Sequence, residues 1–364
     1  MKYLLYIGPG IGDFFMAMHV ARRIKLSDKQ AYITVFSRNN SNRVKLQKEL
    51  LHLQSWIDDE YYYSVNELTC NINLIFNLVK RRYDYSFRVC YVDSKIVSGW
   101  PNKIMRLVSK CSLGTSITGR EDLKYDLSIK FDKNGNFYNF YDELLSKIGI
   151  TKIQNELGYN LFNVDENFLF QQEYYYINKI KHIYQNKVIA LFIGSEAIPI
   201  SAARKSEVKR PKNWPISYWN KLFLLLIERG YCLLLLGSSQ EYEECKKIIS
   251  LKQKNIFNLC GKTSLAESIY IVSNVSLAVG VDTGFMHCAG VIGTTSLTLF
   301  GCTSYKNYLP LSKKAYYIQS EEKCSPCFGT DRLVHCSDFH CMKKISVEDV
   351  YNKIISILGA DSGN

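Results

Sequence analysis

Residues 1–36, MKYLLYIGPGIGDFFMAMHVARRIKLSDKQAYITVF, set the fold of the chain. An apolar and partly aromatic run at 3–7 stops at the turn Gly8-Pro9-Gly10-Ile11-Gly12-Asp13. From Phe14 to Lys25 apolar residues recur at helical spacing, and a second apolar run follows at 31–36. This order predicts a βαβ unit whose two strands pair in parallel through a right-handed crossover.

Strand and helix patterns continue along the chain. In the first half, 42–79 is mostly helical in pattern, 83–92 predicts a strand and 138–148 a helix. In the second half, strand and helix patterns alternate more clearly, and helical patterns separate five apolar runs. These predicted strands are 188–193, 232–236, 256–259, 276–281 and 296–300.

Helix signals in the second half support this reading. A helix over 216–229 begins after Trp214-Pro215 and ends at Gly230. Ser264 and Glu267 have the spacing of a capping box, and a last helix is predicted over 347–358. Alternating strands and helices predict a doubly wound parallel sheet.

We therefore expect an α/β protein with two Rossmann-like domains. The first spans 1–173, the second 174–345, and a helix and tail follow at 346–364. Ligands of open α/β sheets bind at the carboxyl ends of the strands, so we expect these ends of both sheets to face a central cleft.

Composition supports two packed cores. The chain has 364 residues, 47% of them hydrophobic and 22% charged, which excludes a disordered or collagen-like protein. The net charge of +12 favours anionic partners such as phosphates, nucleic acid or an acidic membrane leaflet, without choosing among them.

The sequence shows no targeting or membrane-spanning segment. The apolar run at the start of the chain is too short for a signal h-region, and no apolar window approaches the length of a membrane span. A cytoplasmic protein is expected.

Asp13 is the first candidate for chemistry. It stands at the start of a helix, just after a strand and a glycine turn. A carboxylate there can cap the helix, or it can act as a general base that accepts a proton from an attacking hydroxyl.

A second candidate site is Gly280–His287. A buried strand ends in Asp282-Thr283-Gly284 and a helix begins, so free N–H groups and the helix dipole favour a diphosphate there. Asp282 suits sugar hydroxyls or amide donors better than phosphate. His287 can be interpreted either as a packed structural histidine or as part of the same diphosphate site.

The third site follows the strand at 188–193. Gly194-Ser195 ends that strand, and a basic loop leads to Lys212 before Trp214-Pro215. An ammonium in such a loop can stabilise a leaving diphosphate in place of a metal ion. A single loop lysine can equally be a solvated residue.

A cysteine cluster near the end of the chain has the spacing C-x₂-C-x₈-C-x₄-C. Its members are Cys324, Cys327, Cys336 and Cys341, with His335 and His340 nearby. Four thiols this close fit a structural zinc or iron ion, and free thiols or disulfides are the alternative.

In combination and order, these segments resemble the heptosyltransferases of glycosyltransferase family 9, which build the inner core of bacterial lipopolysaccharide on the GT-B fold. The segments that carry the resemblance are 7–14, Lys212-x-Trp214-Pro215, Ser264-Leu265, 280–288 and 298–303. The resemblance covers nearly the full length and is strongest over 188–303.

The resemblance implies inverting, metal-independent transfer of L-glycero-D-manno-heptose from its ADP derivative. In that family the aspartate of the first glycine turn is the proposed base, which corresponds to Asp13, and the lysine before Trp-Pro contacts donor phosphate, which corresponds to Lys212. Asp282, Thr283 and Gly284 would hold the donor's sugar and diphosphate. The predicted donor site also includes Gly12, Gly194, Ser195, Glu241 and His287.

One position departs from the family pattern. Several relatives carry an acidic residue shortly after the strand that corresponds to 232–236. The preferred alignment places Ser239 there, with Glu241 as the second choice.

The implied partners are ADP-heptose, a lipid-linked oligosaccharide acceptor and, peripherally, the anionic inner membrane. Acceptor contacts are expected from the first half, which contains the basic residues Lys95, Lys103, Arg106 and Arg120. One alternative keeps the fold but changes the nucleotide sugar or uses a protein acceptor. Another is a non-enzymatic nucleic-acid or adaptor protein with a cysteine-bound metal, but no nucleic-acid motif occurs in the chain.

Overall fold

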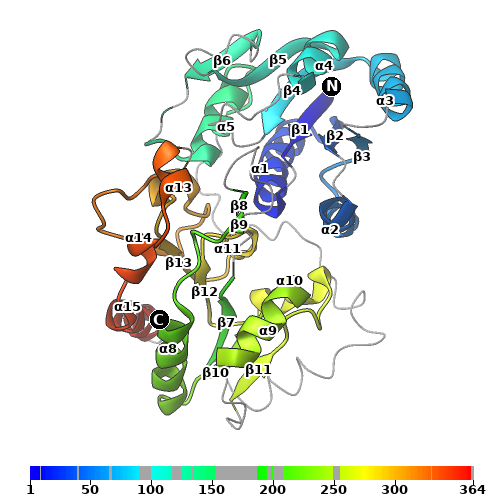
Figure 1. The fold of residues 1–364 in the computed structure, drawn as a ribbon. Helices are drawn as coiled ribbons and strands as arrows, with labels where there is room; N and C mark the ends of the chain where they lie inside the picture. Colours follow the sequence, from blue (N-terminus) through cyan, green and yellow to red (C-terminus); the bar gives the residue numbers. More distant parts are fainter. Residues whose placement is uncertain are drawn as a thin grey trace. The chain divides into compact units, whose positions relative to one another are not determined.

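The computed structural model describes most of the chain. The described residues are 1–8, 10–38, 41–64, 68–89, 100–116, 124–130, 132, 134–151, 187–194, 198–199, 208–248, 255–328 and 330–361. They form two compact units, one within residues 1–151 and one within residues 187–361 (Figure 1). The predicted end of the first domain, at residue 173, lies outside the described residues.

The first unit is built on a six-stranded parallel sheet in the order β3-β2-β1-β4-β5-β6. Its strands are β1 (Lys2–Ile7), β2 (Tyr32–Arg38), β3 (Asp59–Tyr63), β4 (Tyr83–Val89), β5 (Ser109–Ser116) and β6 (Leu127–Lys130). Its helices are α1 (Ile11–Ser27), α2 (Ser41–His52), α3 (Leu68–Arg81), α4 (Trp100–Val108) and α5 (Phe137–Ser146). The βαβ unit predicted at the start of the chain is confirmed as β1, α1 and β2.

Helices pack on this sheet through apolar side chains. Leu4 of β1 lies in one buried cluster with Leu74 and Leu78 of α3 and with residues of α4. α1 and α5 pack against each other, and a buried contact of 2.9 Å joins His19 Nε2 to Asp142 Oδ1. The glycine turn after β1 is thereby held between a buried strand and a buried helix.

The prediction for the first unit is incomplete. Within 42–79, α2 and α3 are helical as predicted, but β3 is a strand. β5 and β6 were not predicted. β3 reads DEYYY and is mostly only partly buried, so it lacks the apolar run by which central strands are recognised.

The second unit holds another six-stranded parallel sheet, in the order β11-β10-β7-β12-β13-β14. Its strands are β7 (Val188–Phe192), β10 (Cys232–Leu235), β11 (Ile256–Asn258), β12 (Leu277–Val281), β13 (Ser296–Phe300) and β14 (Ala315–Gln319). A separate antiparallel pair consists of β8 (Ile198–Pro199) and β9 (Val208–Lys209). The five predicted strands are confirmed, and β14 is a sixth, whose side chains are only partly buried or exposed.

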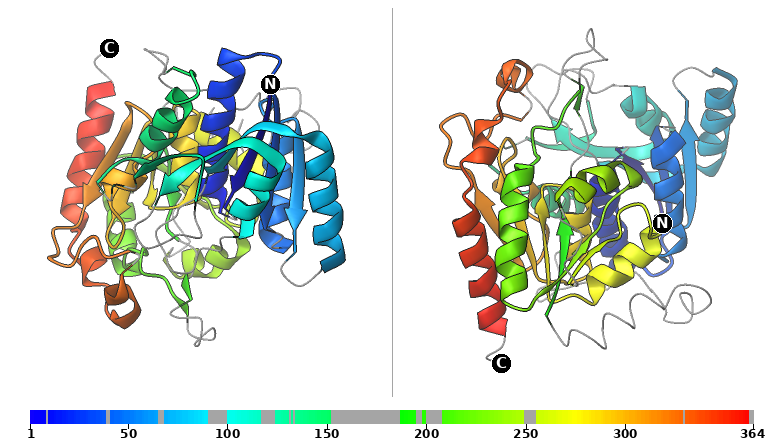
Figure 2. Two further views of the ribbon diagram at one scale, coloured as in Figure 1. Left: turned by 90° about the horizontal axis from the view of Figure 1, so that it is seen from above. Right: turned by 60° about the horizontal axis from the view of Figure 1, so that its bottom comes forward.

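Helices cover this sheet in two groups. The helices are α8 (Ile216–Glu228), α9 (Ser239–Ile248), α10 (Leu265–Ser273), α11 (Gly284–Val291), α12 (Tyr305–Tyr308), α13 (Asp331–His335), α14 (His340–Lys343) and α15 (Val347–Asp361). α8 and α15 lie side by side and share one buried cluster with alternate residues of β7 (Figure 2). Residues of α10 and α11 form another cluster with the intervening residues of β7. This confirms the predicted doubly wound α/β architecture.

Predicted helix signals are confirmed here. α8 begins after Pro215, and the chain turns at Gly230 with φ of +84°. At α10, Ser264 N donates to Glu267 Oε2 at 2.6 Å, and Glu267 N donates to Ser264 Oγ at 3.2 Å. Both bonds of the capping box are therefore formed.

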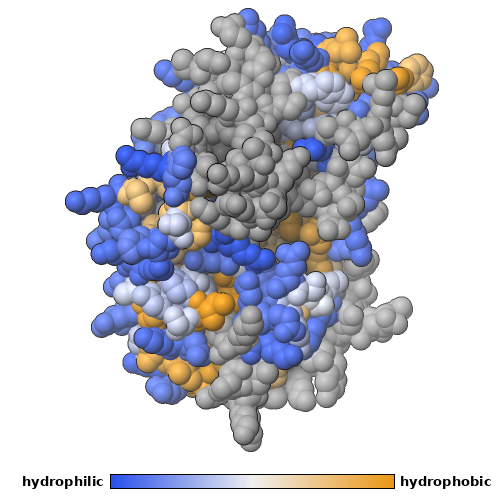
Figure 3. All heavy atoms as spheres, in the orientation of Figure 1, coloured by the Kyte–Doolittle hydropathy of each residue, from blue (hydrophilic) through white to orange (hydrophobic). Residues whose placement is uncertain are grey.

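The surface view shows where apolar side chains are exposed. Among the described residues, no helix is long and apolar enough to cross a bilayer. Hydrophilic side chains cover much of the face drawn in Figure 3, and hydrophobic ones gather over α3 and α4 of the first unit.

Candidate active site

The turn after β12 is the centre of the candidate site. β12 is fully buried, and Asp282 and Thr283 connect it directly to α11. The first N–H groups of a helix have no acceptor within the helix, so they and the helix dipole favour an anion at this point. Thr283 Oγ1 is buried and has no hydrogen-bond partner in the described part of the chain. The turn therefore offers donors to a bound oxyanion.

Lys212 forms a buried ion pair with Asp282. Lys212 Nζ lies 2.8 Å from Asp282 Oδ2, and Asp282 is only 4% exposed. Burial by itself would raise the pKa of Asp282, but the Lys212 ammonium holds that pKa below its ordinary value. Lys212 therefore lies beside the Asp282-Thr283-Gly284 turn, and its contact with donor phosphate stays a prediction.

His287 lies in the first turns of α11 and is also buried. Burial lowers its pKa to about 4, although Asp282 acts in the opposite direction. The imidazole is therefore neutral near pH 7. A neutral ring next to an ion pair can orient it by hydrogen bonding without adding charge.

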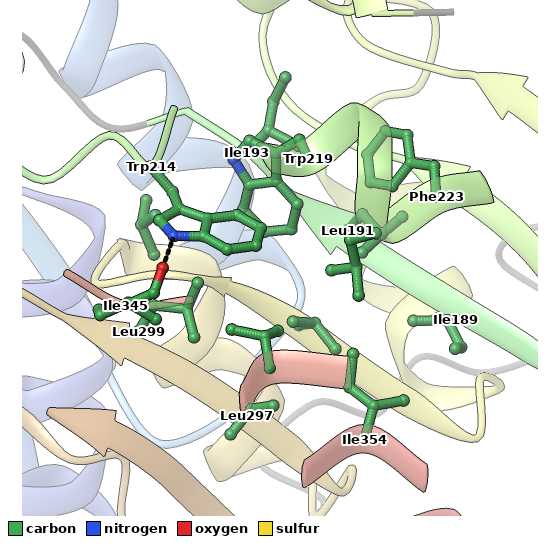
Figure 4. Close-up of a cluster of buried hydrophobic side chains, with 14 of the residues drawn as sticks. Ile189, Leu191, Ile193, Trp214, Trp219, Phe223, Leu297, Leu299, Ile345 and Ile354 are labelled. Atoms are coloured by element: carbon green, nitrogen blue, oxygen red, sulfur yellow. Dashed lines mark hydrogen bonds between the residues drawn. The ribbon is translucent and has the colours of Figure 1, made fainter. Parts of the chain in front are cut away.

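A buried tryptophan fixes the loop that carries Lys212. Trp214 is 1% exposed, and its Nε1 donates to Ile345 O at 3.0 Å (Figure 4). Its ring packs edge-on against Trp219 of α8, with ring centroids 4.8 Å apart. The Trp214-Pro215 turn is thus anchored in the core, two residues after Lys212.

Two aromatic rings flank the Lys212 ammonium. Its Nζ lies 5.3 Å from the ring centroid of Phe328 and 5.8 Å from that of Tyr308. These distances are those of cation–π interactions. Sequence reasoning missed both residues, because nothing in the pattern around Tyr308 or Phe328 indicates an approach to residue 212.

The backbone explains the position of Phe328. Phe328 N and Cys327 N both donate to Cys302 O, at 2.8 and 2.9 Å. Cys302 lies two residues after the end of β13. The start of the cysteine-rich segment is therefore attached to the loop that follows the strand next to β12.

Glu241 is placed at the carboxyl ends of β7 and β10. Its Oε2 accepts hydrogen bonds from Ser238 N at 2.8 Å and from Ser238 Oγ at 2.5 Å. A Cβ at Gly194 would lie 2.5 Å from Glu241 Cγ, so the close contact requires glycine. Arg210 Nη1 lies 3.7 Å from Glu241 Oε1 and 3.6 Å from Glu244 Oε1.

The two candidate positions of the alignment differ in their contacts. Ser239 begins α9 and packs beside Gly261, whereas the Glu241 side chain lies over Gly194. These contacts favour Glu241, the second choice, as the ribose contact, which stays a prediction. Arg210 belongs to the basic loop noted in the sequence, but its pairing with Glu241 was not foreseen. Ser195 lies outside the described residues.

The four predicted metal-ligating cysteines line one cavity of about 250 Å³, together with Cys302 and two histidines. The cysteines are free thiols, and burial raises the pKa of Cys341 to about 12 and also raises that of Cys327. Within the described ranges, no group of three or more His, Cys, Asp or Glu is arranged to hold a metal ion. The structure therefore gives the predicted zinc or iron site no support.

Asp13 belongs to the first unit. It is the third residue of α1, and its Oδ2 accepts a hydrogen bond from Gly10 N at 3.1 Å. A Cβ at Gly8 would lie 2.2 Å from that oxygen, so the side chain folds back over the glycine turn. Asp13 thus caps α1, and Gly12 lies beside it in the same first turn.

The basic residues predicted to contact an acceptor are only partly described. Lys103 and Arg106 are exposed on α4. Lys95 and Arg120 lie outside the described residues.

Two doubly wound units, each built on a six-stranded parallel sheet, are the architecture of GT-B glycosyltransferases. The model of "Glycosyltransferase family 9 (heptosyltransferase)" matches residues 181–337. This match confirms the resemblance to glycosyltransferase family 9 over residues 181–337.

A curated relative agrees with this family. Lipooligosaccharide heptosyltransferase 2 of Haemophilus influenzae is 34% identical over 112 residues. The alignment spans 30% of this chain and 32% of the relative, so the match extends over about a third of the relative's length.

Solved structures share the fold over the whole chain. The E. coli ADP-heptose lipopolysaccharide heptosyltransferase II has a TM-score of 0.70 at 20% identity and covers 100% of both chains. The E. coli heptosyltransferase WaaC with ADP-2-deoxy-2-fluoro heptose has a TM-score of 0.67 at 14% identity, covering 98% of this chain and 99% of that one. The GT-B fold class is therefore confirmed.

Proposed function

We propose that the protein is a heptosyltransferase that moves heptose from ADP-L-glycero-D-manno-heptose to a hydroxyl of a lipopolysaccharide core acceptor. The observation that carries the proposal is the Lys212–Asp282 pair at the start of α11. The names of the relatives support the sugar and the acceptor, and the solved complex of one neighbour contains an ADP-heptose analogue.

Each group in the second unit has a task in this reaction. The N–H groups of α11 and the Thr283 hydroxyl bind the diphosphate, and the Lys212 ammonium balances the charge that develops on it. Asp282 then accepts hydrogen bonds from the sugar. Glu241 accepts from the ribose hydroxyls, as a carboxylate at the end of β10 can. Positive charge from Lys212 takes the place that a divalent cation holds in other transferases.

The transfer step itself is an inverting displacement. Asp13 accepts the proton of the acceptor hydroxyl, whose oxygen forms a bond to the anomeric carbon. The bond from that carbon to the diphosphate oxygen breaks on the opposite face, and ADP leaves. The acceptor is lipid-linked, and the enzyme meets it at an anionic leaflet of the inner membrane.

Incubation with ADP-heptose and truncated core acceptors, with and without EDTA, tests this proposal. We expect an acceptor product heavier by one heptose, formed equally in EDTA, and little product with the variant Lys212→Met. Formation of product from UDP-sugars but not from ADP-heptose would show that the donor is a UDP-sugar. Stabilisation by oligonucleotides rather than ADP in a thermal-shift assay would overturn the enzyme assignment.

A further inference from the structure

The exposed face of α3 has an apolar stripe next to the polar residues Asn73, Asn77 and Lys80. Ile72, Phe76 and Val79 are 56%, 67% and 41% exposed, while Leu74 and Leu78 on the same helix are buried. Positions 72, 76 and 79 are four and three residues apart, so they form one stripe along the helix. A surface helix normally turns charged and polar residues outward. α3 instead has one apolar face toward the core and another toward solvent.

The stripe extends to the neighbouring helix. α3 packs against α4, and Leu107 on α4 is 66% exposed. Four of the nine strongly exposed large hydrophobic side chains among the described residues therefore lie on these two helices. Figure 3 shows the resulting hydrophobic patch over α3 and α4. Clustered exposure of this kind marks an interaction surface, whereas scattered exposure does not.

The charges on the two helices have one sign. Exposed basic side chains on or directly after them are Lys80, Arg82, Lys103 and Arg106. Neither helix contains Asp or Glu. Three acidic residues of the adjoining strands have partners of their own: Asp59 lies 2.5 Å from Arg81 Nη2, Asp84 lies 2.8 Å from Lys110 Nζ, and Glu60 Oε2 accepts a hydrogen bond from Tyr62 OH at 2.5 Å. A partner that presents apolar surface together with negative charge therefore fits this face.

We propose that this α3–α4 face, formed by Ile72, Phe76, Val79 and Leu107 with Lys80, Lys103 and Arg106, docks the protein on an anionic lipid leaflet. Apolar side chains enter the boundary between headgroups and acyl chains, and the cations contact lipid phosphates. A second copy of the chain fits this face less well. In a symmetric dimer the cations of one copy would lie against the same cations of the other copy and repel them. The inference deepens the proposed function, which requires a lipid-linked acceptor.

Vesicle flotation of the full chain, without donor or acceptor, tests the docking. We expect binding to vesicles of phosphatidylcholine mixed with phosphatidylglycerol at least tenfold stronger than to phosphatidylcholine alone. Phe76→Ser should lose at least tenfold in binding to the anionic vesicles, and Lys103→Glu should also weaken it. The matched controls Leu224→Ser and Lys221→Glu change exposed residues of α8 and should bind as the wild type does.

Two outcomes would overturn the docking proposal. One is equal binding of the wild type and Phe76→Ser to anionic vesicles. The other is self-association in solution that Phe76→Ser abolishes, which would assign the face to a second copy of the chain. Transfer to a soluble, deacylated core acceptor should be unchanged in Phe76→Ser. If the wild type does not transfer heptose to this soluble acceptor, the proposed function is contradicted. The vesicle experiment would still test the docking proposal independently.

Discussion

Asp13 has two interpretations, a structural one and a catalytic one. Its carboxylate caps α1 through Gly10 N, which is the structural interpretation. The catalytic interpretation, a general base, is part of the proposed function.

The substitution Asp13→Asn separates the two roles. Asparagine keeps an acceptor oxygen for Gly10 N, so we expect the variant to fold and to bind ADP normally. It cannot take up the proton, so kcat should fall by about 10²–10⁴-fold. Turnover of a core acceptor, with ADP affinity by calorimetry as the control, measures this. Turnover within a few-fold of the wild type would remove Asp13 from the mechanism.

Phe328 is a positioning residue for Lys212, because its ring faces the ammonium. Phe328→Leu keeps an apolar side chain but removes the ring, and we expect ADP to bind more weakly by about two- to thirtyfold, as cation–π energies suggest. Adenosine affinity should not change, because adenosine has no phosphate for Lys212 to contact. Phe328→Tyr should restore ADP binding. An equal loss for ADP and adenosine would indicate a general packing defect instead.

At the scale of elements, the register of α9 decides which side chain covers Gly194. The helix starts at Ser239, directly after Ser238, and its first turn brings Glu241 back over Gly194, just after the end of β7. An alignment shift of two residues therefore moves the proposed ribose contact from a hydroxyl to a carboxylate.

Glu241→Gln and Ser239→Ala test this register. Hydrogen bonds to a charged group contribute about 1.5–3 kcal/mol, so we expect Glu241→Gln to weaken both ADP and adenosine binding by about tenfold or more. Ser239→Ala should leave both affinities close to those of the wild type. Calorimetric titration of the two ligands provides the comparison. Loss of affinity in Ser239→Ala alone would favour the first alignment.

The sequence predicts elements best where both faces of a strand are buried. β7 and β12 are continuous apolar runs, and β13 is a buried run of Leu and Phe with two small hydroxyl residues, so all three are evident from the sequence. β3 and β14 lie at sheet edges, and their tyrosines are mostly only partly buried, so a pattern based on burial cannot find them.

The residues of the candidate site also fall into two groups, those that the sequence indicates and those that it does not. Lys212, Asp282 and Thr283 follow strands or precede a Trp-Pro turn, and such local signals are visible in the sequence. Phe328 and Arg210 act through contacts with residues far away in the chain, which no local pattern records. The cysteines had the spacing of a metal site, yet spacing does not fix where four thiols point.

At the scale of the whole molecule, the net charge of +12 indicated anionic partners without placing them. The pairs of Lys212 with Asp282 and of Lys110 with Asp84 contribute nothing to this net charge, because their opposite charges cancel. The charged side chains of α3 and α4 are all basic, and Lys80, Lys103 and Arg106 are exposed. The structure therefore places part of the positive charge beside the apolar stripe of α3, where the proposed membrane contact lies.

Burial of His287 makes the stability of the protein depend on pH. In the unfolded chain the imidazole binds a proton below about pH 6.5, whereas in the folded protein its pKa is about 4. Lowering the pH from 7 to 5 therefore favours the unfolded state, and His287 should cost about 2 kcal/mol of unfolding free energy over that range. The depressed pKa of Asp282 acts only at lower pH, because that carboxylate stays ionised in both states down to about pH 4–5.

Urea unfolding of the wild type and of His287→Gln at pH 7 and pH 5 measures this contribution. Glutamine keeps hydrogen-bonding groups but does not titrate, so the variant should lose about 2 kcal/mol less than the wild type between the two pH values. All other titrating groups are common to both proteins and cancel in the comparison. Equal losses of unfolding free energy in the two proteins would contradict this prediction. They would mean that His287 binds its proton as readily in the folded state as in the unfolded chain.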